Sequence, residues 1–174
     1  MLVLAGLDPS GGAGLLADAE AVRAAGARPL CVATALTAQT TRRMHGFQPL
    51  APALALQTAQ ALLEEEPVGA IKIGMLGTSA MARAVAELLQ RAGLPVVVDP
   101  VLAASSGAAL FQGGPGAARE AYSALWPSAL ITPNAAEARV LLDLEEEPRD
   151  VSALERAARE LVRRGAKAAL VKGG

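Results

Sequence analysis

The sequence is poor in the residue types that mark disulfide-bonded, nucleic-acid-binding or strongly charged proteins. It has a single cysteine, Cys31, so no internal disulfide can form. Only four residues are aromatic, which is too few for the stacking platforms that bind single-stranded nucleic acid. The formal net charge is −1 and no basic run is long enough to follow a phosphate backbone, so we expect no nucleic-acid partner.

Long apolar runs are also missing. No run approaches the length of a membrane span, and no positively charged segment precedes an apolar stretch at the N-terminus. We therefore expect a cytoplasmic protein that binds no membrane. Cys31 lies between Leu30 and Val32, which predicts a buried strand thiol rather than a nucleophile. His45, the only histidine, is expected to be an exposed loop residue, with a general base as the alternative.

Short apolar runs alternate with longer amphipathic segments along the whole chain. The apolar runs are typical of strands covered on both faces and comprise residues 2–4, 29–35, 70–73, 95–98, 129–132 and 168–171. The segments between them are rich in Ala, Leu, Glu and Arg and predict helices at residues 13–25, 51–65, 79–92, 116–125, 135–142 and 152–164. This alternation predicts a single α/β domain over residues 1–174, with a doubly wound, mostly parallel sheet and helices on both of its faces.

Two of the helices carry recognisable start signals. Asn134 can cap the helix that begins at residue 135. Ser152, followed three residues later by Glu155, predicts a capping box at the start of the last helix.

The segment from Ala5 to Gly14, AGLDPSGGAG, is a glycine-rich loop between a strand and a helix. Such a loop lets backbone N–H groups approach a polar ligand, although the same composition also serves to make a tight corner. The spacing matches neither the Gly-Lys-Ser/Thr phosphate loop nor the dinucleotide fingerprint. Polar residues lie at or just after the ends of all six predicted strands, where ligands of doubly wound sheets bind; they include Asp8, Gln39, Lys72, Asp99, Asn134 and Lys172.

The motifs at these strand ends resemble, in order, those of the hydroxymethylpyrimidine and phosphomethylpyrimidine kinases of thiamin biosynthesis. The matching segments are GLDPSGGAGLLAD at residues 6–18, TAQ at 37–39, IKIGMLG at 71–77, VDPV at 98–101, ITPN at 131–134 with Glu137, and VKGG at 171–174. The resemblance covers the whole chain and implies a ribokinase-like fold, a superfamily that also holds the pyridoxal kinases. It implies transfer of a phosphoryl group from ATP to a hydroxymethylated aminopyrimidine and then to its monophosphate.

Residue roles follow from the same resemblance. Gly6, Asp18 and Gln39 match positions that hold the aminopyrimidine, and Met75 and Val101 match the pocket wall. Ordinary alternatives remain at this stage, since Asp18 could lie on a helix surface, Gln39 could cap a strand and Met75 could be core.

The nucleotide side of the site is also implied by the resemblance. Asp99 and Glu137 match positions that organise Mg²⁺, while Asn134 and Lys172 match nucleotide-binding positions. The implied cofactors are thus ATP and Mg²⁺, and the family resemblance further implies a homodimer. Asn134 could instead only cap its helix, and Lys172 could be a solvated lysine.

The family pattern continues beyond Lys-Gly-Gly through a glycine-rich anion-binding loop that supplies the catalytic residue, so the resemblance implies a chain lacking the C-terminal third. Three alternatives therefore stay open: a pyridoxal kinase, a non-catalytic pyrimidine-binding module, and a fragment of a complete kinase with little activity of its own.

Overall fold

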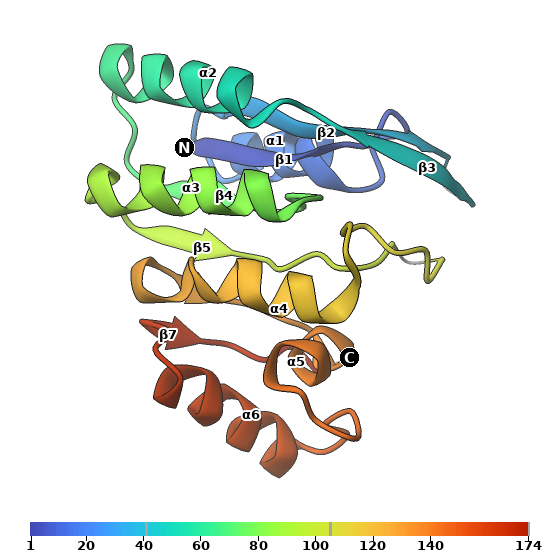
Figure 1. The fold of residues 1–174 in the computed structure, drawn as a ribbon. Helices are drawn as coiled ribbons and strands as arrows, with labels where there is room; N and C mark the ends of the chain where they lie inside the picture. The colour runs from blue at the N-terminus through green and yellow to red at the C-terminus, as the bar shows by residue number, and fades with distance from the viewer. Residues whose placement is uncertain (41, 105, 174) are drawn as a thin grey trace.

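A seven-stranded sheet in the order β3-β2-β1-β4-β5-β6-β7 organises the chain (Figure 1). The computed structural model describes residues 1–40, 42–104 and 106–173, so Gly174 of the last predicted motif lies outside the described part. Every neighbouring pair of strands is parallel except β2 and β3. The strands are β1 (Leu2–Leu7), β2 (Leu30–Gln39), β3 (Met44–Pro49), β4 (Ile71–Ile73), β5 (Val96–Val98), β6 (Leu130–Ile131) and β7 (Ala168–Ala169).

Helices connect the parallel strands, as the alternating pattern predicts. They are α1 (Gly14–Ala24), α2 (Pro52–Glu65), α3 (Ser79–Ala92), α4 (Gly114–Ser123), α5 (Ala135–Leu142) and α6 (Val151–Arg163), with a short 3₁₀ turn at Trp126–Ser128. Figure 1 shows α2, α3 and α4 in front of the sheet and α1 behind β1 and β2. The predicted fold class is therefore confirmed: a doubly wound, mostly parallel sheet with helices on both faces.

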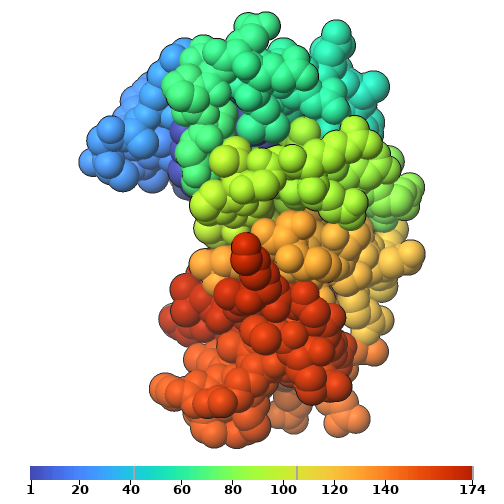
Figure 2. Space-filling model, turned by 90° about the vertical axis from the view of Figure 1, so that its left-hand side faces the viewer, coloured from blue at the N-terminus to red at the C-terminus, as the bar shows by residue number. Residues whose placement is uncertain are grey.

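The alternating side chains of β1 explain the two layers. Leu2 and Leu4 are fully buried in the large core that contains α2, α3, α4, α5 and α6. Val3 and Ala5 point to the opposite face and pack against Leu15 and Val22 of α1 in a smaller cluster. Figure 2 shows α2 near one end of the molecule and the C-terminal segments, coloured orange to red, towards the other.

β3 is absent from the predicted elements. It pairs antiparallel with β2, and its side chains are half-buried or exposed rather than continuously apolar. His45 lies in this strand instead of a loop, and it is exposed as expected. The last residues of β2, from Thr37 to Gln39, pair with β3 alone because the pairing with β1 ends at Leu36 (Figure 1).

Two further predictions were wrong. Cys31 is exposed, because its side chain lies on the face of β2 that α1 covers only in part, whereas its neighbours Leu30 and Val32 are buried on the other face. The start of α6 is capped by Asp150, whose Oδ1 accepts the N–H of Ala153 at 2.7 Å. Ser152 lies inside the helix, where its hydroxyl accepts from Arg156.

Within the described residues, no helix combines the length and the apolar character needed to cross a bilayer.

Candidate functional site

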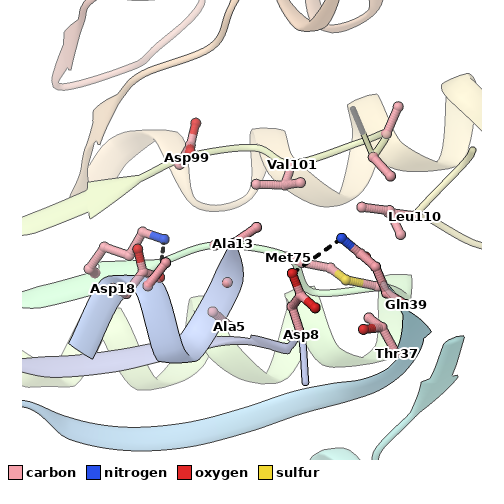
Figure 3. Close-up of a pocket in the computed structure, with 17 residues that line it drawn as sticks. Ala5, Asp8, Ala13, Asp18, Thr37, Gln39, Met75, Asp99, Val101 and Leu110 are labelled. Atoms are coloured by element: carbon pink, nitrogen blue, oxygen red, sulfur yellow. Dashed lines mark hydrogen bonds and ion pairs between the residues drawn. The ribbon is translucent and has the colours of Figure 1, made fainter. Parts of the chain in front are cut away.

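A cavity of about 260 Å³ opens at the carboxyl ends of β1, β2, β4 and β5 (Figure 3). The strand order reverses between β1 and β4, and ligands of doubly wound sheets bind at such a switch point. All five residues expected to hold the substrate line this cavity, namely Gly6, Asp18, Gln39, Met75 and Val101. Asp99 lines it as well. Motifs far apart in the sequence are thus brought to one place.

Two glycines allow the loop after β1 to fold tightly against its own strand. Gly14 has a φ of +59°, and a Cβ added there would lie 2.3 Å from the carbonyl oxygen of Gly6. A Cβ at Gly6 would lie 2.7 Å from Sδ of Met75. The start of α1 and the side chain of Met75 can therefore both approach β1 only because these positions lack side chains.

Asp8 is the most enclosed polar residue of the loop, with 3% of its surface exposed. Its Oδ1 accepts the backbone N–H of Ser10 at 2.9 Å and the hydroxyl of Ser10 at 2.7 Å. Its Oδ2 accepts from Nε2 of Gln39 at 3.3 Å, as the dashed line in Figure 3 shows. Both carboxylate oxygens thus act as acceptors, and one of them orients a predicted substrate-binding side chain.

Asp18 lies on α1 at the other end of the cavity, and its Oδ2 forms an ion pair with Nζ of Lys72 (Figure 3). The side chains are 24% and 18% exposed, so this pair is largely shielded from water. Lys72 comes from the middle of β4, between the buried Ile71 and Ile73, and points to the face that carries α1. Asp18 is therefore held in place by a tertiary contact and is not a free surface residue.

Apolar side chains form the walls between these polar ends. Met75 is 5% exposed and packs in a cluster with Ala35 and Leu110, which Val101 joins from the loop after β5. The arrangement of apolar walls with a few fixed polar groups is the usual composition of a site for a small organic molecule.

The remaining predicted residues lie beside the cavity. Nζ of Lys172 is 2.7 Å from Oδ1 of Asp99, which joins the end of β7 to the end of β5. The backbone of Lys172 also forms an isolated parallel β-bridge with Asn134, and its N–H donates to the carbonyl of Pro133. Asp99 therefore faces both the cavity and this cationic group.

Asn134 and Glu137 form a capping box at the start of α5. Oδ1 of Asn134 accepts the N–H of Glu137, and Oε2 of Glu137 accepts the N–H of Asn134, both at 2.8 Å. The predicted cap at Asn134 is thus confirmed. Burial raises the pKa of the Glu137 carboxyl, and the charge of Asp99 adds to the shift while the N–H of Asn134 and the charge of Lys172 oppose it.

The site offers two carboxylates, Asp99 and Glu137, as candidate ligands for a metal ion. In the described part of the chain, no group of three or more His, Cys, Asp or Glu side chains could enclose a metal. Mg²⁺ differs from such tightly enclosed ions, because one or two carboxylates hold it together with water and substrate phosphates. The two carboxylates present therefore fit Mg²⁺ that arrives with a nucleotide.

The sequence places Asp8 and Lys72 among the polar residues near strand ends but gives neither a specific role. Asp8 follows β1 and Lys72 lies within the short strand β4, so their positions in the motifs are the available signal. Their partners are 31 residues away for Asp8 and 54 for Lys72, so only the folded chain shows what these charges contact.

The fold is that of ribokinase-like small-molecule kinases. A crystal structure of phosphomethylpyrimidine kinase from Clostridium difficile superposes with a TM-score of 0.87 at 34% identity, covering 99% of this chain and 74% of that one. The pyridoxal kinase from Staphylococcus aureus in complex with AMP-PCP and pyridoxal gives a TM-score of 0.84 at 29% identity, with 99% and 61% covered.

The chain belongs to the phosphomethylpyrimidine kinase family, whose model matches residues 8–174. Among curated proteins it is 38% identical over 174 residues to the hydroxymethylpyrimidine/phosphomethylpyrimidine kinase of Rhizobium meliloti. That alignment covers 99% of this chain and 64% of the relative, so the chain spans a little less than two thirds of the relative's length.

Proposed function

We propose that this chain provides the substrate-binding part of an ATP-dependent kinase that phosphorylates 4-amino-5-hydroxymethyl-2-methylpyrimidine and its monophosphate in thiamin biosynthesis. The observation that carries the proposal is the gathering of Gly6, Asp18, Gln39, Met75 and Val101 around a single cavity. These residues come from four separate motifs, and family membership gives the cavity its expected ligand.

The chemistry of the cavity agrees with an aminopyrimidine. Such a ring presents donors and acceptors on its edge, which a carboxylate and an amide can pair, and its faces and methyl group need apolar walls. Asp18 and Gln39 supply the polar groups at the two ends. Met75 and Val101 supply apolar contact between them, so the ring would lie across the ends of β1 and β4.

Phosphoryl transfer would take place on the side of the cavity where Asp99 and Lys172 meet. We assign nucleotide binding to Lys172 and Asn134, since a lysine cation 2.7 Å from Asp99 can exchange that carboxylate for a phosphate oxygen. Asp99 and Glu137 would hold Mg²⁺ through water. When bound, Mg²⁺ would neutralise phosphate charge, which is much of what a kinase must supply.

Titration calorimetry with the hydroxymethylpyrimidine tests substrate binding. Gln39→Ala should weaken it by roughly 1–3 kcal/mol, because the ring loses its partner and the Asp8 carboxylate loses a donor. Gln57→Ala is the matched control, since Gln57 is an exposed glutamine on α2 outside the cavity. Equal affinity of the wild type and Gln39→Ala would remove Gln39 from the binding site.

The nucleotide assignment is tested separately. Lys172→Met should weaken binding of Mg-ADP by roughly tenfold, as expected for one lost charge-assisted hydrogen bond. Lys167→Met, which removes an exposed lysine just before β7, should leave the affinity unchanged. If both variants bind Mg-ADP like the wild type, the nucleotide does not contact Lys172.

A pyridoxal kinase is the second candidate, favoured by the structural similarity to the enzyme that holds AMP-PCP and pyridoxal. Titration with pyridoxal under the same conditions separates the two, because the tighter ligand identifies the substrate. Tight pyrimidine binding without any pyrimidine monophosphate formed from Mg-ATP would instead favour a non-catalytic binding module or a fragment of a complete kinase.

A further inference from the structure

Asp8 is a buried carboxylate that the proposed reaction does not use. It lies in the loop between β1 and α1, lines the cavity and contacts neither Lys72 nor Lys172. Instead it accepts three hydrogen bonds, two from Ser10 and one from Nε2 of Gln39. Since a carboxylate in this arrangement only accepts, the side of Gln39 that faces it must carry the N–H group.

This contact fixes which way round the Gln39 amide stands. A primary amide is planar and carries its oxygen and nitrogen on opposite arms, so it can flip and exchange a donor for an acceptor. A flip of Gln39 would bring Oε1 against Oδ2 of Asp8, placing two acceptors face to face. In the described structure Nε2 is the atom that donates to Asp8, and no hydrogen bond from the described residues reaches Oε1.

We propose that Asp8 is a positioning residue that locks the Gln39 amide and thereby selects 4-aminopyrimidines over 4-oxopyrimidines. One Nε2 hydrogen is committed to Asp8, which leaves Oε1 as an acceptor and the second Nε2 hydrogen as a donor. An aminopyrimidine offers the complementary pair on one edge, with a donor on its amino group and an acceptor on the neighbouring ring nitrogen. The inference rests on the proposed function, because it assumes that a pyrimidine occupies this cavity.

A 4-oxopyrimidine reverses this edge. It carries an acceptor oxygen at position 4 and an N–H donor on the neighbouring ring nitrogen, so it matches the amide only after a flip. The flip is opposed by Asp8, and a site whose polar groups are left unpaired rejects the mismatched analogue strongly. The two ligands differ little in size, so the apolar walls formed by Met75 and Val101 do not distinguish them.

Asp8→Asn is the decisive variant, since Asn has the same shape and its Oδ1 can still accept from Ser10. Its Nδ2 then faces Gln39 and donates, which favours the flipped amide. We expect the wild type to bind 4-amino-5-hydroxymethyl-2-methylpyrimidine at least roughly tenfold more tightly than its 4-oxo counterpart, and Asp8→Asn to abolish or invert that ratio. An unchanged ratio in Asp8→Asn would overturn the proposal.

Ser10→Ala is the matched control. It removes a donor from Oδ1 of Asp8 and leaves the contact between Oδ2 and Gln39 in place. If Asp8 served only to hold the loop, both variants would weaken the two ligands in parallel. Under our proposal the ratio of the two affinities changes in Asp8→Asn and stays at the wild-type value in Ser10→Ala.

A measurement on the unliganded wild type covers the case in which Asp8→Asn does not fold or the chain binds no pyrimidine. Side-chain amide resonances of Gln39, assigned by their loss in Gln39→Ala, should include one Nε2 proton that exchanges with water several-fold more slowly than those of Gln57. Equal exchange at Gln39 and Gln57 would contradict the lock. Absence of pyrimidine binding with a protected Gln39 proton would instead contradict the proposed function alone.

Discussion

At the scale of single residues, the site depends on positions where a side chain is missing. Gly14 begins α1 in the left-handed region and touches the carbonyl of Gly6, whereas Gly11 in the same loop has a φ of +73° with open space around it. Replacing Gly11 would therefore strain only the backbone conformation, whereas replacing Gly14 would add a steric clash to the same strain.

Gly14→Ala should therefore lower the free energy of unfolding by roughly 2–4 kcal/mol, because its Cβ forces the loop away from β1. Gly11→Ala should lower the free energy of unfolding by only about 1 kcal/mol, because it strains the backbone conformation without a clash. Urea denaturation of both variants checks this. Equal losses would show that the close approach of Gly14 to Gly6 contributes nothing to stability.

Cys31 combines exposure with a thiol that resists ionisation. Partial removal of water by the surrounding chain raises the pKa of the Cys31 thiol, the charge of Arg23 opposes the shift and that of Asp18 adds to it. Because the thiolate is the reactive form, alkylation by iodoacetamide should keep accelerating above the usual thiol midpoint of about 8.5. Arg23→Gln should slow the reaction at neutral pH, as followed by intact mass. A faster reaction in that variant would contradict the role of Arg23.

The sequence predicts the positions of the site residues better than their contacts. Residues at strand ends must meet once the strands are parallel, which is why Gly6, Gln39 and Met75 were foreseeable together. The ion pair of Lys72 with Asp18 was not foreseeable. The sequence shows only a lysine between two isoleucines of a strand, and its partner becomes apparent only when α1 is packed against that face of the sheet.

At the scale of elements, the six α-helices and the six parallel strands of the described residues were predicted, and β3 was not. Buried parallel strands appear as continuous apolar runs, which are easily recognised. β3 is an edge strand in which Met44 and Phe47 are half-buried among exposed neighbours, and it ends in Pro49. Its pairing with β2 depends on the folded sheet and cannot be predicted from the local sequence pattern.

Asp150 and Ser152 are both residue types that cap helices well, so the start of α6 could in principle use either one. Asp150 is the observed cap, so Asp150→Ala should lower the free energy of unfolding by about 1 kcal/mol. Ser152→Ala should change it by less than about 0.5 kcal/mol, since the Ser152 hydroxyl accepts a hydrogen bond from the exposed Arg156 and does not cap the helix. Thermal denaturation of the two variants decides between them, and a larger loss in Ser152→Ala would restore the capping box with Glu155.

At the scale of the whole molecule, β7 lies at one margin of the sheet and pairs only with β6 among the described strands. Apolar side chains are exposed beside it, with Leu170 56% and Val162 46% accessible. Unpaired strand edges with apolar neighbours favour association between chains. The homodimer implied by the family resemblance stays a proposal and is separate from association of this polypeptide through the β7 margin.

We accordingly expect the average mass in sedimentation velocity experiments to rise with protein concentration, and Leu170→Lys to suppress the rise. Leu54→Lys is the control, because Leu54 is equally exposed, at 59%, but lies on α2 near the other end of the molecule (Figure 2). A monomer at all concentrations would contradict association through this margin.

The overhang of β2 has a consequence for ligand binding. Asp18 and Lys72 join α1 to the middle of the seven-stranded sheet. Gln39 belongs to a stretch of β2 whose backbone pairs with β3 alone and which reaches β1 and its loop only through the side chains of Thr37 and Gln39. Two-stranded ribbons are marginally stable by themselves, so the cavity has one firm wall and one wall that can adjust its distance to the bound molecule.

Binding of a pyrimidine should therefore slow amide hydrogen exchange mainly in Thr37–Gln39 and the facing residues of β3, while Ile71–Ile73 exchange slowly with or without it. Under the proposed function, movement of this ribbon would let the cavity accommodate either the hydroxymethylpyrimidine or its monophosphate while the rest of the sheet stays unchanged.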